Sequence, residues 1–246
     1  KSCMKLSEKL LSSFLAFELD ININSSLHNI RTDAIKRFEK LGFPNKKLED
    51  WKYTSLNQII SEDYTLFAKQ KNVLDFNKVK DYFINNIESY KIVFVDGYFD
   101  PFLSQTSHDG IDICIMSAGL NKDKYSKIIN KYFNKISSLE DSLTSLNTAF
   151  CKEGVYIHIP KNTIADKPVE IVHFATENEA ALMLQPRNLI VVEENSEIEI
   201  IESHQSLTTN PIFTNSVTEI FANKNSNIDY YKIQNDVNSA SLIDNT

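Results

Sequence analysis

Hydrophobic positions in the first third of the chain recur at the spacing of an α-helix. The first stripe consists of Leu6, Leu10, Phe14 and Phe17. Because these residues are three or four positions apart, they share one face of a helix. A second stripe consists of Leu27, Ile30, Ala34, Phe38 and Leu41. The pattern therefore predicts two amphipathic helices.

The second of these helices carries signals at both ends. Ser25 or Ser26 precedes it and can accept a hydrogen bond from the free backbone N–H groups of its first turn. Gly42 follows its last apolar position, where glycine readily adopts the left-handed conformation that ends a helix, and Pro44 lies just beyond. The sequence thus predicts a helix that begins after the serines and ends at Gly42.

Three later segments again have the spacing of a helix. A segment with the spacing of a strand lies between the first and the second of them. Apolar stripes predict helices over 77–87, 125–136 and 142–150. The apolar segment 91–95 is followed by Asp96-Gly97, a dipeptide that favours a type I′ turn, and then by a second apolar segment. A β-hairpin is therefore predicted at this turn.

From Val155 onward the chain reads as β-strands that repeat. Asn195-Ser196-Glu197-Ile198 returns thirty residues later as Asn225-Ser226-Asn227-Ile228, with an apolar-rich segment before and after each copy. A looser copy has its polar corner at Asn162, 33 residues before Asn195. Repeats of about 20–50 residues built from strands and corners are typical of solenoids, in which each unit buries its face against the next. The sequence therefore predicts stacked β coils with long open edges instead of a closed pocket.

These patterns predict a mixed α and β fold in three parts. Residues 1–90 form an N-terminal helical domain, 91–150 an α/β connector and 151–246 a β-helix core. A length of 246 residues is enough for one large domain or two smaller ones, and a hydrophobic content of 42% supports a real core. Only five glycines are present, so we expect Asn, Asp and Ser to occupy the turns.

Charge narrows the range of partners. The net charge is −7, and the acidic excess lies in residues 91–246. Nucleic acids and anionic membranes attract clustered Lys and Arg, so an acidic β region argues against both. No apolar run reaches the about 18 residues of a membrane span, and the N-terminus does not resemble a cleavable signal. We expect a cytoplasmic protein.

The side chains that commonly carry catalysis do not form a known motif. Cys3, Cys114 and Cys151 have no paired spacing, which argues against a disulfide framework, a CxxC metal site or an Fe–S cluster held within this chain. No Gly-rich phosphate loop, Ser nucleophile elbow or HExxH motif is present. We therefore predict no catalytic residue, no metal ligand and no tightly bound cofactor, and leave cofactor-binding residues unassigned.

Two groups of polar residues remain as weaker candidates for metal binding. His158, His173 and His204 lie on or beside strands, and a solenoid can stack distant residues on one face. Strand alternation places His158 outward, so we favour surface or hydrogen-bonded histidines. The acidic run consists of Glu193, Glu194, Glu197, Glu199 and Glu202. For this run we favour a solvated outer face over capture of ferrous iron by carboxylates.

Several segments resemble the SufB/SufD family of iron–sulfur cluster assembly proteins, and SufD-type members more than SufB. The matching segments are FPNKKLEDWKYTSL (43–56), VFVDGYF (93–99), SLNTAFCKEGVYIHIPKNTIADKPVEI (145–171), PRNLIVVEENSEIEIIE (186–202) and NSVTEIFANKNSNIDYYKIQND (215–236). They lie in the family's order, and the combination of EDWKYT, PRNLIVV and TEIF is specific. The resemblance implies an N-terminal helical domain followed by a right-handed parallel β-helix, in agreement with the repeat.

The same resemblance implies a function. SufD-type chains pair with SufB through their β-helices, both bind the ATPase SufC, and the SufBCD complex builds an iron–sulfur cluster that it hands to other proteins. We therefore expect a non-catalytic scaffold for which iron or an Fe–S cluster is a transient cargo. Family members run further than Thr246, so we expect the β-helix to be truncated there. The segment that docks SufC and supplies the family's metal-associated histidine is then absent from this sequence.

Open strand edges support an assembly role on physical grounds, because unpaired backbone groups invite self-association or pairing with a related β-helix. A carbohydrate-active β-helix enzyme is the alternative. Such sites need exposed carboxylates beside basic and aromatic groups, and Arg187 is the only arginine after residue 37. A β-helical interaction module unrelated to iron also remains open.

Overall fold

The computed structural model describes residues 5–21, 27–67, 74–105, 108, 110–136, 141–177 and 180–246. The helices are α1 (Leu6–Asp20), α2 (His28–Leu41), α3 (Asn57–Ile60), α4 (Phe76–Val79), α5 (Met116–Leu120), α6 (Asp123–Tyr132) and α7 (Ser142–Phe150), with the 3-10 turns η1 (Glu49–Trp51) and η2 (Lys80–Tyr82). The strands are β1 (Tyr64–Thr65), β2 (Tyr90–Val95), β3 (Tyr98–Phe99), β4 (Asp112–Ile115), β5 (Val155–Ile159), β6 (Val169–Ala175), β7 (Ala181–Leu184), β8 (Arg187–Val192), β9 (Glu197–Ser206), β10 (Ile212–Ala222), β11 (Asn227–Asn235) and β12 (Ala240–Asn245).

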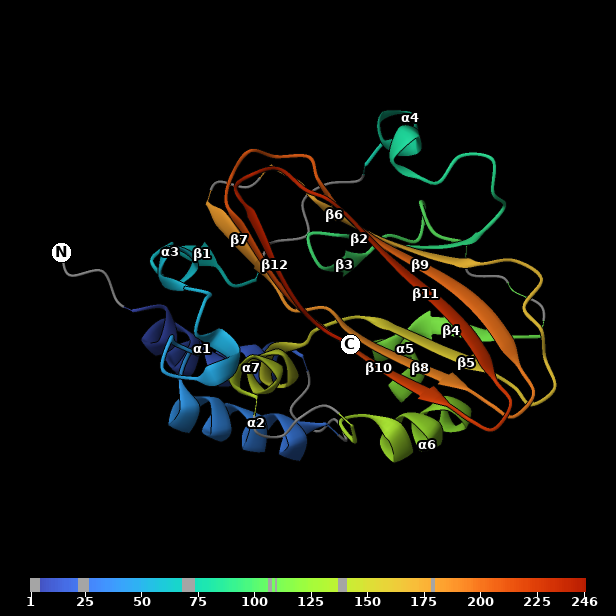
Figure 1. The fold of residues 1–246 in the computed structure, drawn as a ribbon, viewed down its shortest axis with the longest axis horizontal. Coiled ribbons are helices and arrows are strands. Elements are labelled where there is room, and N and C mark those ends of the chain that lie inside the picture. Colours follow the sequence, from blue (N-terminus) through green and yellow to red (C-terminus); the bar gives the residue numbers. More distant parts are fainter. Residues whose placement is uncertain are drawn as a thin grey trace.

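The two predicted N-terminal helices are confirmed as α1 and α2, and they pack with α7 at one end of the molecule (Figure 1). Their apolar faces share one core that includes Leu10, Phe38 and Leu146. Gly42 ends α2 with a φ of 66°, in the left-handed region. Ser25 and Ser26, the predicted N-caps, lie outside the described residues.

Two of the later helices are shorter than predicted, because buried glutamates take up backbone N–H groups. The helix predicted over 77–87 is reduced to α4 and η2, and the N–H of Ile84 donates to Glu170 at 2.8 Å. The helix predicted over 125–136 ends at Tyr132. The N–H groups of residues 134–136 donate to the Glu219 carboxylate at 2.7, 2.9 and 3.1 Å. Tertiary contacts therefore set both ends, and the helix over 142–150 is confirmed as α7.

The predicted β repeat is confirmed by the pairing of the strands. From β5 onward the chain moves between two sheets, one in the order β1-β7-β10-β8-β5-β4 with β12 beside β10, the other in the order β11-β9-β6-β2-β3. The pairs β8–β10 and β9–β11 are parallel with a shift of thirty residues, for example Leu189 beside Glu219 and Ile198 beside Ile228. We call β5 to β12 the strand stack. In Figure 1 it extends from β7 and β12, left of the centre, to β9 and β11 on the right.

Asparagines make the corners of the strand stack, as the low glycine content predicts. Asn162, Asn195 and Asn225 have φ values of 61°, 56° and 56°. Their side-chain amides form a ladder, with Asn195 donating to Asn162 at 3.0 Å and Asn225 donating to Asn195 at 3.1 Å. Asparagine tolerates this left-handed conformation better than other side chains. The sequence repeat is therefore a repeat of one turn geometry.

The hairpin predicted at Asp96-Gly97 is confirmed, since β2 and β3 are antiparallel and both turn residues have positive φ. The first strand of the hairpin, β2, also pairs in parallel with β6 and so belongs to the second sheet. Likewise, β1 lies in the helix-rich first third of the chain but pairs with β7. Both pairings link segments that are far apart in sequence. The spacing of apolar residues along the chain does not predict them.

An apolar layer fills the space between the two sheets. It includes Ile157 of β5, Ile171 of β6, Ile190 of β8 and Ile200 of β9. The outer face of the first sheet is covered by α5 and α6, and that of the second by the segment around α4 (Figure 1). Part of the interior is polar instead of apolar, and this part forms the candidate site.

The fold is thus mixed α and β, with N-terminal helices and two sheets rich in parallel pairs. In the described part of the chain, none of the helices has the length and apolar character required to cross a bilayer.

Candidate functional site

The register of β6 and β9 brings two of the three candidate histidines together. His173 pairs directly with His204, and their rings stack with centroids 4.6 Å apart and an angle of 10° between their planes. Both side chains are buried. Each histidine is an even number of residues from an inward-pointing isoleucine of its own strand, Ile171 for His173 and Ile200 for His204. Because side chains alternate along a strand, each histidine points to the same side as that isoleucine. The two imidazoles therefore lie between the sheets.

Glu202 lies in the same place, which corrects the assignment of the whole acidic run to a solvated face. Its side chain is fully buried, with a relative exposure of 0%. Glu197 and Glu199 are exposed as predicted, whereas Glu202 is an even number of residues from Ile198 and Ile200. Because side chains alternate between the two faces of a strand, Glu202 must point inward with those isoleucines. Strand parity was the signal in the sequence that could have identified it.

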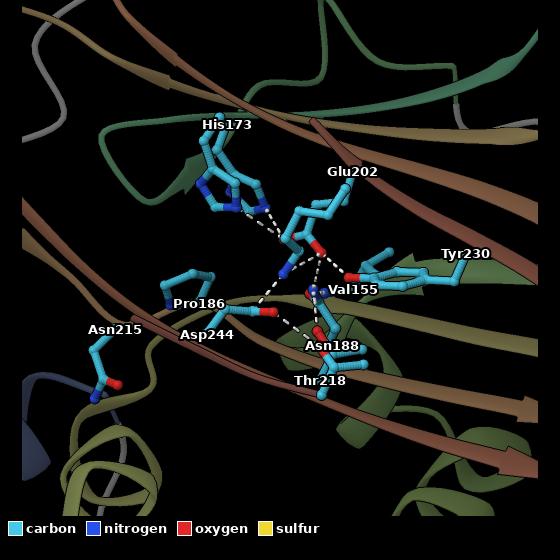
Figure 2. A network of polar contacts seen from close by, with 12 residues as sticks. Val155, His173, Pro186, Asn188, Glu202, Asn215, Thr218, Tyr230 and Asp244 are labelled. Carbon is cyan, nitrogen blue, oxygen red and sulfur yellow. Dashed lines mark hydrogen bonds and ion pairs between the residues drawn. The ribbon is translucent and has the colours of Figure 1, made fainter. Parts of the chain in front are cut away.

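The two oxygens of the Glu202 carboxylate have different surroundings (Figure 2). Oε1 lies 3.1 Å from His173 Nε2 and 3.2 Å from His204 Nε2. Oε2 accepts hydrogen bonds from the Tyr230 hydroxyl and, at 3.4 Å, from Asn188 Nδ2, and it lies 3.4 Å from Lys232 Nζ. One oxygen is thus held by β8 and β11, while the other faces two imidazoles.

A second layer of contacts fixes the residues that hold Oε2. The Asn188 side chain also donates to the Thr218 hydroxyl at 3.2 Å, and its amide oxygen Oδ1 accepts a hydrogen bond from the backbone N–H of Val155 at 3.1 Å. Lys232 forms an ion pair with Asp244 of β12. The cluster therefore spans several strands, and its geometry depends on the register of the strand stack.

Electrostatics keep the carboxylate ionised. Burial alone raises the pKa of Glu202, but the hydrogen bond from His173, the imidazole of His204 and the charge of Lys232 outweigh it and hold this pKa well below its ordinary value. For His173, burial is the largest effect and lowers its pKa. The site therefore presents a carboxylate beside an uncharged imidazole, a combination that suits a cation.

A cavity of about 60 Å³ adjoins the two imidazoles. Its lining includes His173, His204, Phe94, Phe174 and Met183. A space of this size exceeds the volume that one water molecule needs. The two imidazoles therefore border room for a small molecule or ion.

The third histidine candidate lies elsewhere. His158 points away from the apolar interior that Ile157 and Ile159 face, as predicted, but it is buried. Its Nδ1 lies 3.0 Å from Asp112 and its Nε2 lies 3.6 Å from Glu193. Among the described residues, the candidate metal group contains His173, Glu202 and His204 and does not include His158.

The described thiols are also separate from this site. Cys114 and Cys151 are free and belong to the apolar cluster between the first sheet and its covering helices. Burial raises the pKa of the Cys114 thiol to about 11. Cys3 lies outside the described residues. Among the described residues, the donor group between the sheets therefore consists of nitrogen and oxygen atoms, without a thiol.

Two family models match the chain in succession. Residues 4–171 match the SufBD protein N-terminal region, and residues 173–246 match the SufBD core domain of the SUF system for FeS cluster assembly. The chain therefore belongs to the SufBD family, as its sequence motifs predict.

Curated relatives are named for iron–sulfur cluster assembly. An iron–sulfur cluster assembly SufBD family protein of Synechocystis sp. is 28% identical over 222 residues, covering 87% of this chain and 48% of the relative. The iron–sulfur cluster assembly protein SufD of Bacillus subtilis is 26% identical over 226 residues, covering 85% and 48%. A chloroplastic SufBD family protein of Arabidopsis thaliana is 26% identical over 224 residues, covering 83% and 39%. The chain spans half the length or less of these relatives.

Proposed function

We propose that this chain is part of a non-catalytic scaffold subunit of the SUF iron–sulfur cluster assembly machinery, with iron or a cluster as its cargo. The observation that carries the proposal is the pair of SufBD family matches, which together extend from residue 4 to residue 246. The relatives named for iron–sulfur cluster assembly support it. The free thiols Cys114 and Cys151 fit a reducing compartment such as the cytoplasm.

The proposal includes a right-handed parallel β-helix as the scaffold. Parallel pairs at shifts near thirty residues and the asparagine ladder support it. We retain the division into a helical domain (1–90), a connector (91–150) and a β-helix core (151–246). The contacts of β1 with β7 and of β2 with β6 bind the first two parts closely to the third.

Partners would be a SufB-like β-helix and a SufC-like ATPase, with self-association as the alternative. Two strand edges support pairing. Among the described residues, β11 pairs only with β9, and β12 pairs only with β10. Unpaired strand edges offer a row of backbone N–H and C=O groups to another strand.

The test uses the full-length protein with SufB-like and SufC-like proteins from the same organism. Co-purification of a stable complex on size-exclusion chromatography, and loss of Fe–S enzyme activity in cells depleted of the protein, are the expected results. A chain that remains separate from both partners, together with normal Fe–S enzymes after depletion, would contradict the proposal. A homodimer without SufB on sedimentation would support self-association.

The alternative of a carbohydrate-active enzyme would need an accessible basic residue, and Arg187 does not provide one. Arg187 is 1% exposed and lies 2.8 Å from Glu219 in a buried ion pair. Its guanidinium also stacks over the Phe133 ring. It is therefore not accessible to a sugar acid. Turnover of polyuronate by the purified chain would reverse this conclusion.

A further inference from the structure

The cluster between the sheets has the composition of a transition-metal site. It offers two imidazole nitrogens and one carboxylate oxygen, all within 4.8 Å of one another. Two histidines and one carboxylate form a set that holds borderline divalent ions such as Fe²⁺, Co²⁺ and Zn²⁺, whereas Mg²⁺ and Ca²⁺ prefer oxygen donors. We propose that His173, Glu202 and His204 bind one divalent first-row transition-metal ion inside the strand stack.

The carboxylate is oriented as a metal ligand would be. Glu202 Oε2 is held by Tyr230, Asn188 and Lys232, whereas Oε1 has only the two imidazoles as its neighbours among the contacts of the described residues. Hydrogen bonds to the outer oxygen of a ligating carboxylate fix its direction. The ion would lie between Oε1 and the two Nε2 atoms. Bond lengths of about 2.0–2.2 Å are then reached by small side-chain movements.

One nitrogen of the cluster has no hydrogen-bond partner in the described structure. His204 Nε2 is buried and lies 3.2 Å from Glu202 Oε1, but the contact does not have the geometry of a hydrogen bond. A buried polar atom without a partner costs free energy. Coordination by a metal ion would give this nitrogen a partner, with Nε2 as the ligating atom.

Charge and space around the cluster are compatible with an ion. Lys232 is shared between Glu202 Oε2 and Asp244, so one positive charge faces two carboxylates and a net negative charge remains for a divalent cation. The cavity of about 60 Å³ beside both imidazoles can hold water or a further ligand. Three protein ligands with an open position are typical of metal sites that exchange ligands. We expect the proposed site to be of this open kind.

The simplest alternative is a purely structural cluster, in which His173 donates its Nε2–H to Glu202 Oε1 and His204 only packs against the His173 ring. The proposal goes beyond the scaffold function and does not depend on it. A metal titration therefore decides it without reference to cluster assembly. The variants His204→Gln and Glu202→Gln each remove one ligand with little change of size. The matched control is His158→Gln, because His158 is also buried and also lies beside carboxylates.

The experiment is a titration of the chelator-treated full-length chain with Co²⁺ without oxygen, followed by its visible absorption bands and by competition with Zn²⁺. One equivalent should bind. Affinity should fall at least about 100-fold in both ligand variants, because loss of even an outer contact costs 10–100-fold. His158→Gln should bind as the wild type does. Absence of stoichiometric binding, or equal affinity in His204→Gln and His158→Gln, would overturn the proposal.

Circular dichroism shows whether each variant folds. Should the ligand variants fail to fold, X-ray absorption of the Zn²⁺-loaded native chain gives the decision. Two imidazoles and at least one oxygen in the first shell are expected. A shell of oxygen alone would mean that the ion is adventitious and lies on surface carboxylates such as Glu197.

Discussion

Two buried glutamates of the strand stack, Glu202 and Glu219, show how differently a carboxylate can be surrounded. Glu219 faces the helices, where it pairs with Arg187 at 2.8 Å and accepts three backbone N–H groups from residues 134–136. Glu202 faces the interior, where Oε2 is similarly held but Oε1 meets two imidazoles. Both carboxylates have a lowered pKa.

The difference lies in what the partners can do. A guanidinium and backbone N–H groups only donate hydrogen bonds, so they leave Glu219 no place for another ligand. Imidazoles can donate a hydrogen bond or bind a metal with the same nitrogen. We therefore expect Glu219 to stabilise the fold by joining β10 to the segment after α6. We expect Glu202 to bind a metal ion. Variants of the two clusters should separate these roles.

The largest effect is expected from Arg187→Met. Removing one partner of a buried ion pair leaves Glu219 as an uncompensated buried charge, which costs about 3–5 kcal/mol of unfolding free energy. Chemical denaturation of the purified chain measures this loss. Metal affinity should not change. The control is Lys161→Met, whose exposed pair with Glu194 should contribute less than about 1 kcal/mol. A loss for Arg187→Met as small as that of the control would contradict the structural role.

Tyr230→Phe tests the other cluster. The variant removes the hydroxyl that holds Glu202 Oε2, so the carboxylate is less well oriented. Loss of an outer contact of this kind lowers metal affinity by about 10–100-fold. The Co²⁺ titration measures it, and Tyr231→Phe on the exposed neighbour is the matched control. Equal affinity in both variants would show that the Tyr230 contact does not orient a ligand.

A smaller effect should appear in the pH dependence of stability. Although burial acts to raise the pKa of Glu219, the charge and hydrogen bond of Arg187 and the backbone N–H groups lower it below the ordinary value of 4.5. A lowered folded-state pKa contributes stability that is present above about pH 4.5 and is lost as the pH falls through the folded value. Each pKa unit corresponds to about 1.4 kcal/mol.

The stability difference between wild type and Glu219→Gln should therefore shrink as the pH falls below about 4.5. Urea denaturation at a series of pH values measures it. A difference that stays constant over this range would mean that Glu219 does not titrate with a lowered pKa.

The smallest effect is expected from Cys114→Ser. The pKa of this thiol is raised to about 11, so it is protonated at neutral pH. It lies in the cluster under α5 and α6, separate from His173 and His204. Metal affinity should be unchanged, and alkylation of the native chain by iodoacetamide at pH 7 should be slow. A marked loss of affinity would mean that sulfur takes part in the site.

Local patterns in the sequence predicted much of the fold. Helical stripes located α1, α2 and α7, Asp96-Gly97 located a hairpin, and the recurrence of Asn195 at Asn225 predicted both the pairing shift and the corners. These features depend on neighbours in the chain or on a repeat. They are therefore visible without a structure.

Features that depend on a single long-range contact leave no local pattern in the sequence. The early ends of α4 and α6 arise from Glu170 and Glu219, which come much later in the sequence. Treating the acidic run as one group places Glu202 on the solvated face, which is wrong. Its parity with Ile198 and Ile200 predicts burial, and the register of β6 with β9 then supplies the histidines.

The most direct test of the contrast between the two glutamates is anomalous diffraction from crystals of the full-length chain grown with Co²⁺. The account predicts a single strong peak between the sheets, about 2.0–2.2 Å from Glu202 Oε1 and from Nε2 of His173 and His204. No peak should lie beside Glu219. A map without density among these three residues, or with peaks only at exposed carboxylates such as Glu197 and Glu199, would contradict it.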